Sequence, residues 1–418
     1  MLRKASMYDG KCDDFDLKVT ISYLGLYMNR FAELTLYGCG ILTVLLLNAG
    51  LFSCTSSKGE QKQPEISDSI PKSHFGIDPS SPNPVVIGGR LMTFYEINFD
   101  NFTKDTVRLD GVKIMNAYNT TAIASFSGGS LSAIHTLKNK ARVGKNIIPP
   151  GASSTVYLEI ALPSTSGNLS IYHNIEYTRS LETRHFSGAS ISILPSERNI
   201  LGPPLGEGLW AAVYDPNWER GHRRVQYIVD GKPWLPGRYA IDFIKMDEKG
   251  KYAKGDEDQI KNWYGYGADV LAVQDAYVIA VDTTFTESPT LSGHKDYSPE
   301  RATGNYICLY FPGFFAFYEH LKPGSIKVKE GQTVAKGEVI ASLGYTGNTT
   351  GPHLHFHLAK GKSPLGSEGK PYVFDQFTLM GKYDDFSKFG KERWTDLKKG
   401  KRIIKEEFPV SNTIINFR

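Results

Sequence analysis

The stretch "GPHLHFHLAKG", residues 351–361, places three histidines on alternate residues: His353, His355 and His357. Apolar and polar positions alternate here, which predicts a β-strand whose residues two apart point to the same face. The three imidazoles would then emerge side by side, about 6–7 Å from one to the next. A solvated face of an edge strand is one interpretation. However, three aligned imidazoles in a chain of only ten histidines better suit a metal or proton-transfer site.

The N-terminal region reads as a secretory signal. Residues 36–52 are almost wholly apolar and lead into "LFSC", which resembles a bacterial lipobox with Cys54 as the lipidated residue. Residues 28–30, "MNR", supply a short positive region, so Met28 is an alternative start of the chain. An uncleaved transmembrane anchor is the competing interpretation. Both place the rest of the chain outside the cytoplasm and beside a membrane, facing the periplasm or the exterior.

Cysteine usage limits the metal chemistry that the chain can support. The four cysteines are Cys12, Cys39, Cys54 and Cys308. If cleavage precedes Cys54, the mature chain keeps two cysteines, so neither a disulfide framework nor a cysteine-rich zinc site is expected. Any metal must therefore be held by histidine and carboxylate.

Composition and turn signals divide the chain into successive parts. The expected boundaries are 1–53 for the signal and lipobox region, 54–83 for a flexible tether, 84–200 for a β-sandwich, 205–378 for a second β-domain and 379–418 for a C-terminal extension. The tether is rich in Ser, Pro, Gly, Lys and Glu and lacks a hydrophobic period. Short β-branched and aromatic runs between turn residues indicate a mainly β protein whose first domain is an immunoglobulin-like sandwich. We expect this sandwich to fold separately and to have little catalytic role.

Histidines of the predicted sandwich give no sign of a site. His135, His173 and His185 are isolated in the sequence. Each is expected to be an ordinary core or surface histidine. The mixed-charge run after residue 380 is expected to be solvated, as a helix or an extension.

Three motifs in the second domain together resemble the lysostaphin/LytM-type zinc endopeptidases, which cut peptide cross-links of bacterial peptidoglycan. They are "RYAIDF" with Asp242, "YEHL" with His320 followed by "VKEGQTVAKGEVIASLG", and "TGNTTGPHLHFHL" with His353 and His355. The resemblance covers about residues 205–365. It implies a LytM-type antiparallel β-sheet or barrel domain that holds one Zn²⁺ ion. By the family pattern, Asp242 and His355 are metal ligands, and His320 and His353 are catalytic groups.

One position departs from the family pattern. The family expects a histidine four residues before the aspartate, where this chain has Arg238. A guanidinium cannot ligate zinc. His222, in "ERGHRRVQYIVDGKPW", could replace the ligand if a hairpin turning at Asp230-Gly231 brings it beside Asp242. His357, which stands where the family often has an acidic residue, is the second candidate, and a chain without a proper zinc site is the third possibility.

The sequence thus predicts a zinc-dependent peptidoglycan endopeptidase, anchored in the cell envelope as a lipoprotein through Cys54. The alternative is a degenerate LytM-type domain that binds cell wall or activates another wall hydrolase, and Arg238 favours it. If the enzyme works, Arg238 is expected either to point away from the ion or to bind a substrate carboxylate in the cleft. The formal net charge of +4 gives no case for nucleic acid as a partner.

Overall fold

The computed structural model describes residues 75–138, 144–163, 169–195, 199–216, 218, 221–398 and 400–417. The expected signal region, Cys54 and most of the expected tether lie outside these residues. No helix within the described ranges is long and apolar enough to cross a membrane. Two parts are distinguished below, the sandwich segment (residues 75–195) and the large-sheet segment (residues 199–417), and both belong to one compact unit that begins at Gln63.

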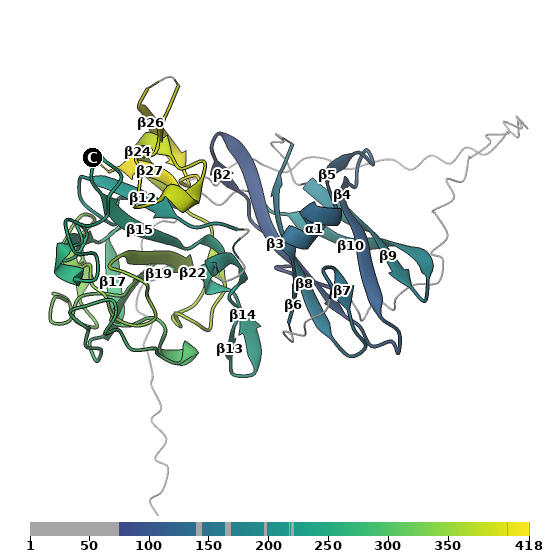
Figure 1. Cartoon of the computed structure of the whole chain (residues 1–418), viewed down its shortest axis with the longest axis horizontal. Coiled ribbons are helices and arrows are strands. Elements are labelled where there is room, and N and C mark those ends of the chain that lie inside the picture. The colour runs from purple at the N-terminus through teal and green to yellow at the C-terminus, as the bar shows by residue number, and fades with distance from the viewer. Residues whose placement is uncertain are drawn as a thin grey trace, which may run out of the picture. The chain divides into compact units, whose positions relative to one another are not determined.

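The sandwich segment consists of two five-stranded antiparallel sheets (Figure 1). One sheet contains β1 (Phe75–Asp78), β2 (Val85–Ile87), β3 (Arg90–Asp100), β6 (His135–Leu137) and β8 (Ser153–Ala161). The other contains β4 (Val107–Asn116), β5 (Ala122–Ser127), β7 (Ile147–Ile148), β9 (Leu169–Arg179) and β10 (Glu182–Ile193), and the helix α1 (Gly128–Ile134) connects β5 to β6.

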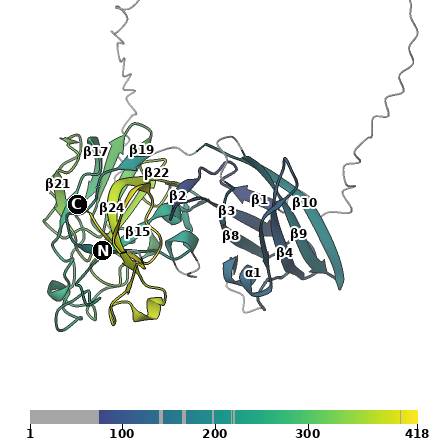
Figure 2. The same cartoon turned by 90° about the horizontal axis from the view of Figure 1, so that it is seen from above.

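Alternation of side chains explains how these two sheets pack. Along β9, residues 169, 171, 173, 175 and 177 are buried, as expected for a strand with one face on a core. The inward residues of both sheets form a single hydrophobic cluster, and Figure 2 separates the layer of β3 and β8 from the layer of β4, β9 and β10. Strand β1 begins within the range that the sequence assigned to the tether.

The large-sheet segment is built on one extended sheet. Its strands follow in the order β11 (Ile200–Leu201), β24 (Val373–Lys382), β27 (Thr413–Asn416), β12 (Leu209–Val213), β15 (Ile241–Met246), β22 (Leu354–Ala359), β19 (Phe314–Glu319), β18 (Tyr306–Phe311), β17 (Ala276–Asp282) and β20 (Thr333–Val334). β23 (Gly369–Lys370) pairs with β22, and β25 (Thr395–Asp396) and β26 (Arg402–Glu407) pair with β24. Two small sheets pair β13 (Tyr227–Val229) with β14 (Lys232–Trp234) and β16 (Asp269–Leu271) with β21 (Val339–Ser342). Short 3₁₀ helices are η2 (His222–Arg224), η3 (Pro236–Tyr239), η4 (Ile260–Asn262), η5 (Pro299–Arg301) and η6 (Phe386–Lys388).

The C-terminal residues are part of this sheet, contrary to the expected solvated extension. Strand β24 runs across the expected boundary at residue 378, and β27 lies between β24 and β12. All four residues of β27 are buried. The run of charges that suggested solvation includes η6, β25 and β26, and β26 is a mostly exposed strand that pairs with β24.

The two segments share a hydrophobic core where the sandwich begins. Val85, Ile87 and Phe94 belong to the same buried cluster as the inner residues of the large sheet. The ring of Phe94 packs edge-on against Tyr239, with centroids 5.1 Å apart. The Tyr239 hydroxyl donates a hydrogen bond of 3.2 Å to the Asn83 carbonyl oxygen. A cut near residue 200 would therefore expose apolar surface on both sides.

Candidate metal centre

Strand register brings the first site residues together. β15 pairs with β22 so that Asp242 lies opposite His355, and β22 pairs with β19 so that His355 lies opposite Glu319. Residues opposite each other in antiparallel strands point to the same face. His357 follows two residues after His355 on the same strand, as the sequence predicted. One face of three neighbouring strands thus presents two carboxylates and two imidazoles.

A hairpin brings His222 to the same face. β13 and β14 pair around a two-residue turn at Asp230 and Gly231, whose φ values of 52° and 71° suit the tight turn of a hairpin. The chain then returns through η3 into β15. η2 lies against η3 where Gly237 has no side chain: a Cβ there would come within 2.7 Å of the His222 carbonyl oxygen. His222 Nε2 consequently lies 2.9 Å from Asp242 Oδ2.

His222, Asp242 and His355 fit a zinc ion. Each offers one ligand atom, and the three atoms lie within 4.8 Å of one another. His355 Nδ1 is 3.0 Å from Asp242 Oδ1, so nitrogen and carboxylate oxygen face the same point. Two imidazoles and one carboxylate are a donor set that zinc takes in hydrolytic sites, where a further position stays open for water.

His357 orients the imidazole of His355. His355 Nε2 lies 3.2 Å from His357 Nδ1. When His355 carries its proton on Nε2, it donates to His357 and leaves the Nδ1 lone pair directed at Asp242. A metal-binding histidine commonly donates its second N–H to such an acceptor, which fixes tautomer and ring orientation. His357 therefore lies beside the three-residue donor set and contacts it through His355.

The electrostatics of the centre favour deprotonated ligands. Burial alone would raise the pKa of Asp242, but the adjacent His222 and His353, by charge and hydrogen bonding, hold that pKa well below its usual range. Burial lowers the pKa of His355 to about 4, and the neighbouring His222 adds to the effect. Metal ligation requires an ionised carboxylate and neutral imidazoles, and the pKa shifts of Asp242 and His355 both favour that state near neutral pH.

His353 and His320 lie at one side of the donor set, where the sequence placed the catalytic groups. Their ring centroids are 4.7 Å apart. His353 Nδ1 is 2.8 Å from the Gly351 carbonyl oxygen and donates to it, so its Nε2 is directed at Asp242 Oδ1, 3.2 Å away. His320 Nδ1 donates in the same manner to the Thr346 carbonyl oxygen over 2.8 Å. In both rings the backbone contact thus leaves Nε2 free to accept a proton.

These two histidines have opposite pKa shifts. Burial lowers the pKa of His320 well below its usual value, and the charges of His353 and His355 act in the same direction. For His353, burial acts against the charged form, but the Asp242 carboxylate outweighs it and raises the pKa. One ring is therefore held neutral and the other takes up a proton more readily, which suits two different steps of proton transfer.

Arg238 points away from the metal centre. Its side chain is 1% exposed and pairs with Glu96 of β3 and, over 2.8 Å, with Glu368. The expectation that it binds a substrate carboxylate in the cleft is wrong, because its guanidinium is already paired with the buried Glu96 and the partly buried Glu368. Arg238 therefore neither ligates a metal nor repels one from the donor set.

Glu319 is a site residue that the sequence analysis missed. It is 5% exposed, and its Oε1 lies 3.9 Å from His357 Nδ1. Burial, together with the charge of Asp242, raises the pKa of Glu319 to about 8. The signal was its place next to His320 in "YEHL", but only the register of β19 against β22 places it opposite His355.

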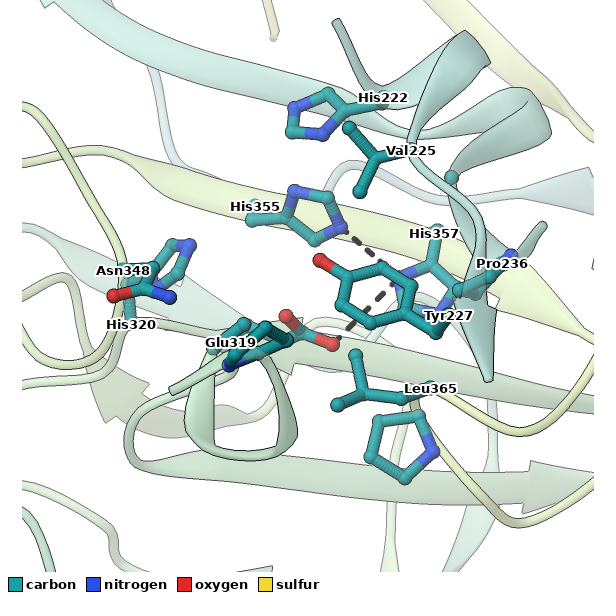
Figure 3. Close-up of a pocket in the computed structure, with 14 residues that line it drawn as sticks. His222, Val225, Tyr227, Pro236, Glu319, His320, Asn348, His355, His357 and Leu365 are labelled. Atoms are coloured by element: carbon teal, nitrogen blue, oxygen red, sulfur yellow. Dashed lines mark hydrogen bonds and ion pairs between the residues drawn. The ribbon is translucent and has the colours of Figure 1, made fainter. Parts of the chain in front are cut away.

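His222, Glu319, His320, His355 and His357 line one cavity of about 300 Å³. Figure 3 shows His222, His355, His357 and Glu319 converging on it, with His320 and Asn348 at one side and Tyr227 and Leu365 at another. Of the residues predicted from the sequence, Asp242, His355, His222, His320 and His353 meet at this place, whereas Cys54 lies outside the described residues.

Residues 263–367 match the sequence profile of Peptidase family M23. The matched range contains His320, His353 and His355 and begins after His222 and Asp242. Residues 263–367 are therefore similar to this peptidase family, in the half of the site that contains His320, His353 and His355.

Two curated relatives match a shorter stretch. The chain is 41% identical over 63 residues to the peptidoglycan DD-endopeptidase ShyB, and 38% identical over 65 residues to the peptidoglycan DD-endopeptidase ShyA, both of Vibrio cholerae serotype O1. Each match covers 15% of this chain, and 14% and 15% of the two relatives. The chain thus spans about a seventh of the length of these relatives.

Solved structures give weaker likenesses. The catalytic domain of lysostaphin from Staphylococcus simulans is 20% identical, with 40% of this chain and 88% of that chain covered and a TM-score of 0.22. A zinc-containing peptidase from Vibrio cholerae is 16% identical, with 66% and 80% covered and a TM-score of 0.23. With TM-scores this low, neither likeness bears on function.

Proposed function

We propose that this protein is a zinc-dependent endopeptidase that cleaves the peptide cross-links of bacterial peptidoglycan. Its M23 domain makes it a hydrolase of the metallopeptidase type. The observation that carries the proposal is the 2.9 Å approach of His222 Nε2 to Asp242 Oδ2, because it supplies a third ligand where the family pattern has lost one.

The three donors have separate tasks in this proposal. Asp242 and His355 are fixed by the register of β15 and β22, and His222 closes the set from η2. Zinc, when bound, would act as a Lewis acid that lowers the pKa of water to about 7. An ionised Asp242 is the state that the neighbouring His222 and His353 already favour.

His353 and His320 would move protons beside the donor set. Each ring has its Nδ1 proton held by a backbone carbonyl, so the Nε2 lone pair faces inward and can take a proton from water. The same groups can then return the proton to the leaving amine. Proton transfer by positioned side chains contributes roughly 100- to 10,000-fold to rate.

The competing function, a degenerate domain that only binds cell wall or activates another hydrolase, had its support in Arg238. That residue is engaged by Glu96 and Glu368, and its position is taken by His222. Nothing at the centre therefore requires loss of catalysis. The alternative would regain support if the purified protein bound wall fragments but no metal.

The test is digestion of purified peptidoglycan by the metal-loaded protein, with products separated by chromatography and identified by mass spectrometry. New stem-peptide termini should appear, disappear with chelator and return with Zn²⁺. His222→Ala should give no products. Uncut peptidoglycan at full metal loading would contradict the proposal.

We further propose that the mature protein is anchored to a membrane of the cell envelope by lipid on Cys54, facing the periplasm or the exterior. The apolar run before "LFSC" supports this. Metabolic labelling with palmitate should mark the wild type and leave Cys54→Ala unlabelled. Equal labelling of both, or of neither, would contradict the anchor.

A further inference from the structure

The third donor of the metal centre is held differently from the other two. Asp242 and His355 sit on paired strands in the middle of the large sheet, so their positions follow from strand register. His222 sits in η2, a 3₁₀ helix of three residues, and its side chain is 31% exposed. Three residues of 3₁₀ helix have little stability of their own. Some other contact must keep His222 in place.

Arg223 and Arg224, the other two residues of η2, point into the sandwich segment. Arg223 pairs with Glu96 on β3 and donates to the Leu158 carbonyl oxygen on β8 over 3.1 Å. Its guanidinium also lies over the ring of Phe94, 5.2 Å from the centroid. The Arg223 side chain is 5% exposed. The residue next to the metal donor is thus buried among strands of the other segment.

Arg224 extends the same attachment. Its Nη2 donates to the Ala133 carbonyl oxygen of α1 over 2.6 Å. The Tyr157 hydroxyl of β8 donates to the Arg224 carbonyl oxygen over 3.3 Å, and the guanidinium lies over the same ring at 5.5 Å. The side chains of both η2 arginines therefore contact the sandwich segment. Arg224 also contacts it through its backbone carbonyl oxygen.

Glu96 joins the two short helices that flank the donor set. One of its carboxylate oxygens pairs with Arg223 of η2 and the other with Arg238 of η3. Glu96 is 1% exposed, so both ion pairs are shielded from water. A buried carboxylate shared by two guanidinium groups fixes the geometry of both. If either guanidinium moves away, one carboxylate oxygen is left buried without its charged partner.

We propose that the metal centre is assembled by both segments, with Glu96 as a positioning residue that holds His222 at its ligand position through Arg223. This rests on the proposed function in one respect, that His222 is a ligand. The sandwich segment then acts as a clamp that holds the third donor, His222, in place. Metal affinity therefore depends on the contacts between the sandwich segment and η2. A merely accessory sandwich would leave metal binding unchanged when the clamp is loosened.

The experiment measures metal binding by the full-length protein rather than its activity. Co²⁺ is added to wild type, Glu96→Gln, Arg223→Met and His222→Ala, and the visible d–d absorption reports the coordination number and geometry of the bound ion. Zn²⁺ affinity is measured by competition with a chromophoric chelator, and melting temperature is recorded for each variant. In Arg223→Met the Glu96 carboxylate still pairs with Arg238, so it is not left as an unpaired buried charge.

A matched control weakens the contact between the segments elsewhere. Glu407 accepts a hydrogen bond of 3.0 Å from the Gly89 backbone N–H, between the β2–β3 turn and β26 and without contact to η2. Glu407→Ala should bind Zn²⁺ within about twofold of wild type. Glu96→Gln and Arg223→Met should bind it about 10- to 100-fold more weakly, the usual cost of losing a group that orients a ligand, with Co²⁺ spectra shifted toward that of His222→Ala.

The outcomes separate this proposal from the proposed function. If His222→Ala loses metal while folded Glu96→Gln and Arg223→Met bind it as wild type does, the clamp is wrong and the enzyme proposal stands. If all variants, Glu407→Ala included, lose metal in proportion to their melting temperatures, the effect is general instability and the clamp is again wrong. Wild-type protein that takes up no Co²⁺ overturns both proposals.

Discussion

The sandwich segment and the large-sheet segment both bury histidines, but with different partners. His173 on β9 is fully buried, its Nδ1 donates to the Ala189 carbonyl oxygen, and its Nε2 accepts from the Tyr95 hydroxyl. His355 on β22 is nearly as buried, and its two nitrogens face Asp242 and His357. Burial lowers the pKa of both rings to about 4.

A lowered pKa therefore does not distinguish a structural histidine from a functional one. The partners do. A backbone carbonyl and a hydroxyl can only hold the ring of His173, whereas a carboxylate and a second imidazole can themselves bind a metal. His357, with Nε2 unpartnered among the described residues, shows the same contrast with His173. For His173, these partners agree with the expectation of an ordinary core histidine.

Removing a metal donor should give the largest difference in Zn²⁺ affinity between a variant of His355 and a variant of His173. His355→Ala and His222→Ala should each weaken Zn²⁺ binding by more than the roughly 100-fold that loss of an orienting group costs, because a ligand itself is removed. His173→Gln should leave affinity unchanged. Metal content of dialysed protein by mass spectrometry checks this, and unchanged zinc in His222→Ala would remove that residue from the site.

Removing a proton-transfer group should lower rate without lowering metal content. His353→Ala and His320→Ala are expected to reduce peptidoglycan hydrolysis about 100- to 10,000-fold, because Nε2 of each faces the donor set but is not needed to hold the ion. Steady-state release of stem-peptide fragments and metal content are measured on the same samples. Equal metal loss in these variants and in His355→Ala would abolish the distinction between the two roles.

Truncating Arg238 should affect stability more than any exposed charge does. Arg238→Ala leaves the buried Glu96 and the partly buried Glu368 with fewer partners, which costs about 3–5 kcal/mol of unfolding free energy. The control is Lys336→Ala, which breaks an ion pair of 2.8 Å with Asp375 at a site where both side chains are over a third exposed, and should cost about 1 kcal/mol or less. Denaturant titration of both variants gives the comparison, and similar small losses would mean that the buried pairs contribute little.

The structural histidine should be visible as acid sensitivity. Its pKa is about 4 in the folded chain against 6.5 for a free side chain, so the unfolded state takes up the proton first as pH falls. The stabilising contribution is complete above pH 6.5 and is lost on the way to pH 4, about 3 kcal/mol in all.

His173→Gln tests this contribution, since an amide can make both hydrogen bonds but does not titrate. The free energy of unfolding of wild type should therefore fall more steeply between pH 7 and pH 4.5 than that of the variant. Parallel curves would show that His173 does not differ in pKa between the two states.

The sequence predicted the local parts of the site well. Two of the three alternating histidines, His355 and His357, lie on β22, whereas His353 directly precedes it. The turn at Asp230 and Gly231 forms the expected hairpin, and His222 lies beside Asp242. These features depend on period-two alternation and turn chemistry, which are written in neighbouring residues.

Other features depended on contacts between distant residues. Arg238 is held by Glu96, 142 positions away, and no local pattern indicates that pairing. Glu319 required the register between two strands, which sequence alone does not give. The buried β27 is only four residues long, too short to stand out beside the charged run that precedes it.

Strand β27 also has a consequence for the time at which the centre can form. It lies between β24 and β12, and β12 in turn pairs with β15, the strand that carries Asp242. A chain that emerges from the ribosome N-terminus first can complete the sandwich segment early, but it cannot finish this sheet until residues 413–416 have emerged. Pairing across about 200 residues of sequence closes slowly, because the entropy of a long loop is lost before its contacts form. The nascent chain therefore carries His222 and Asp242 without the sheet that would make them a site until β27 has been synthesised.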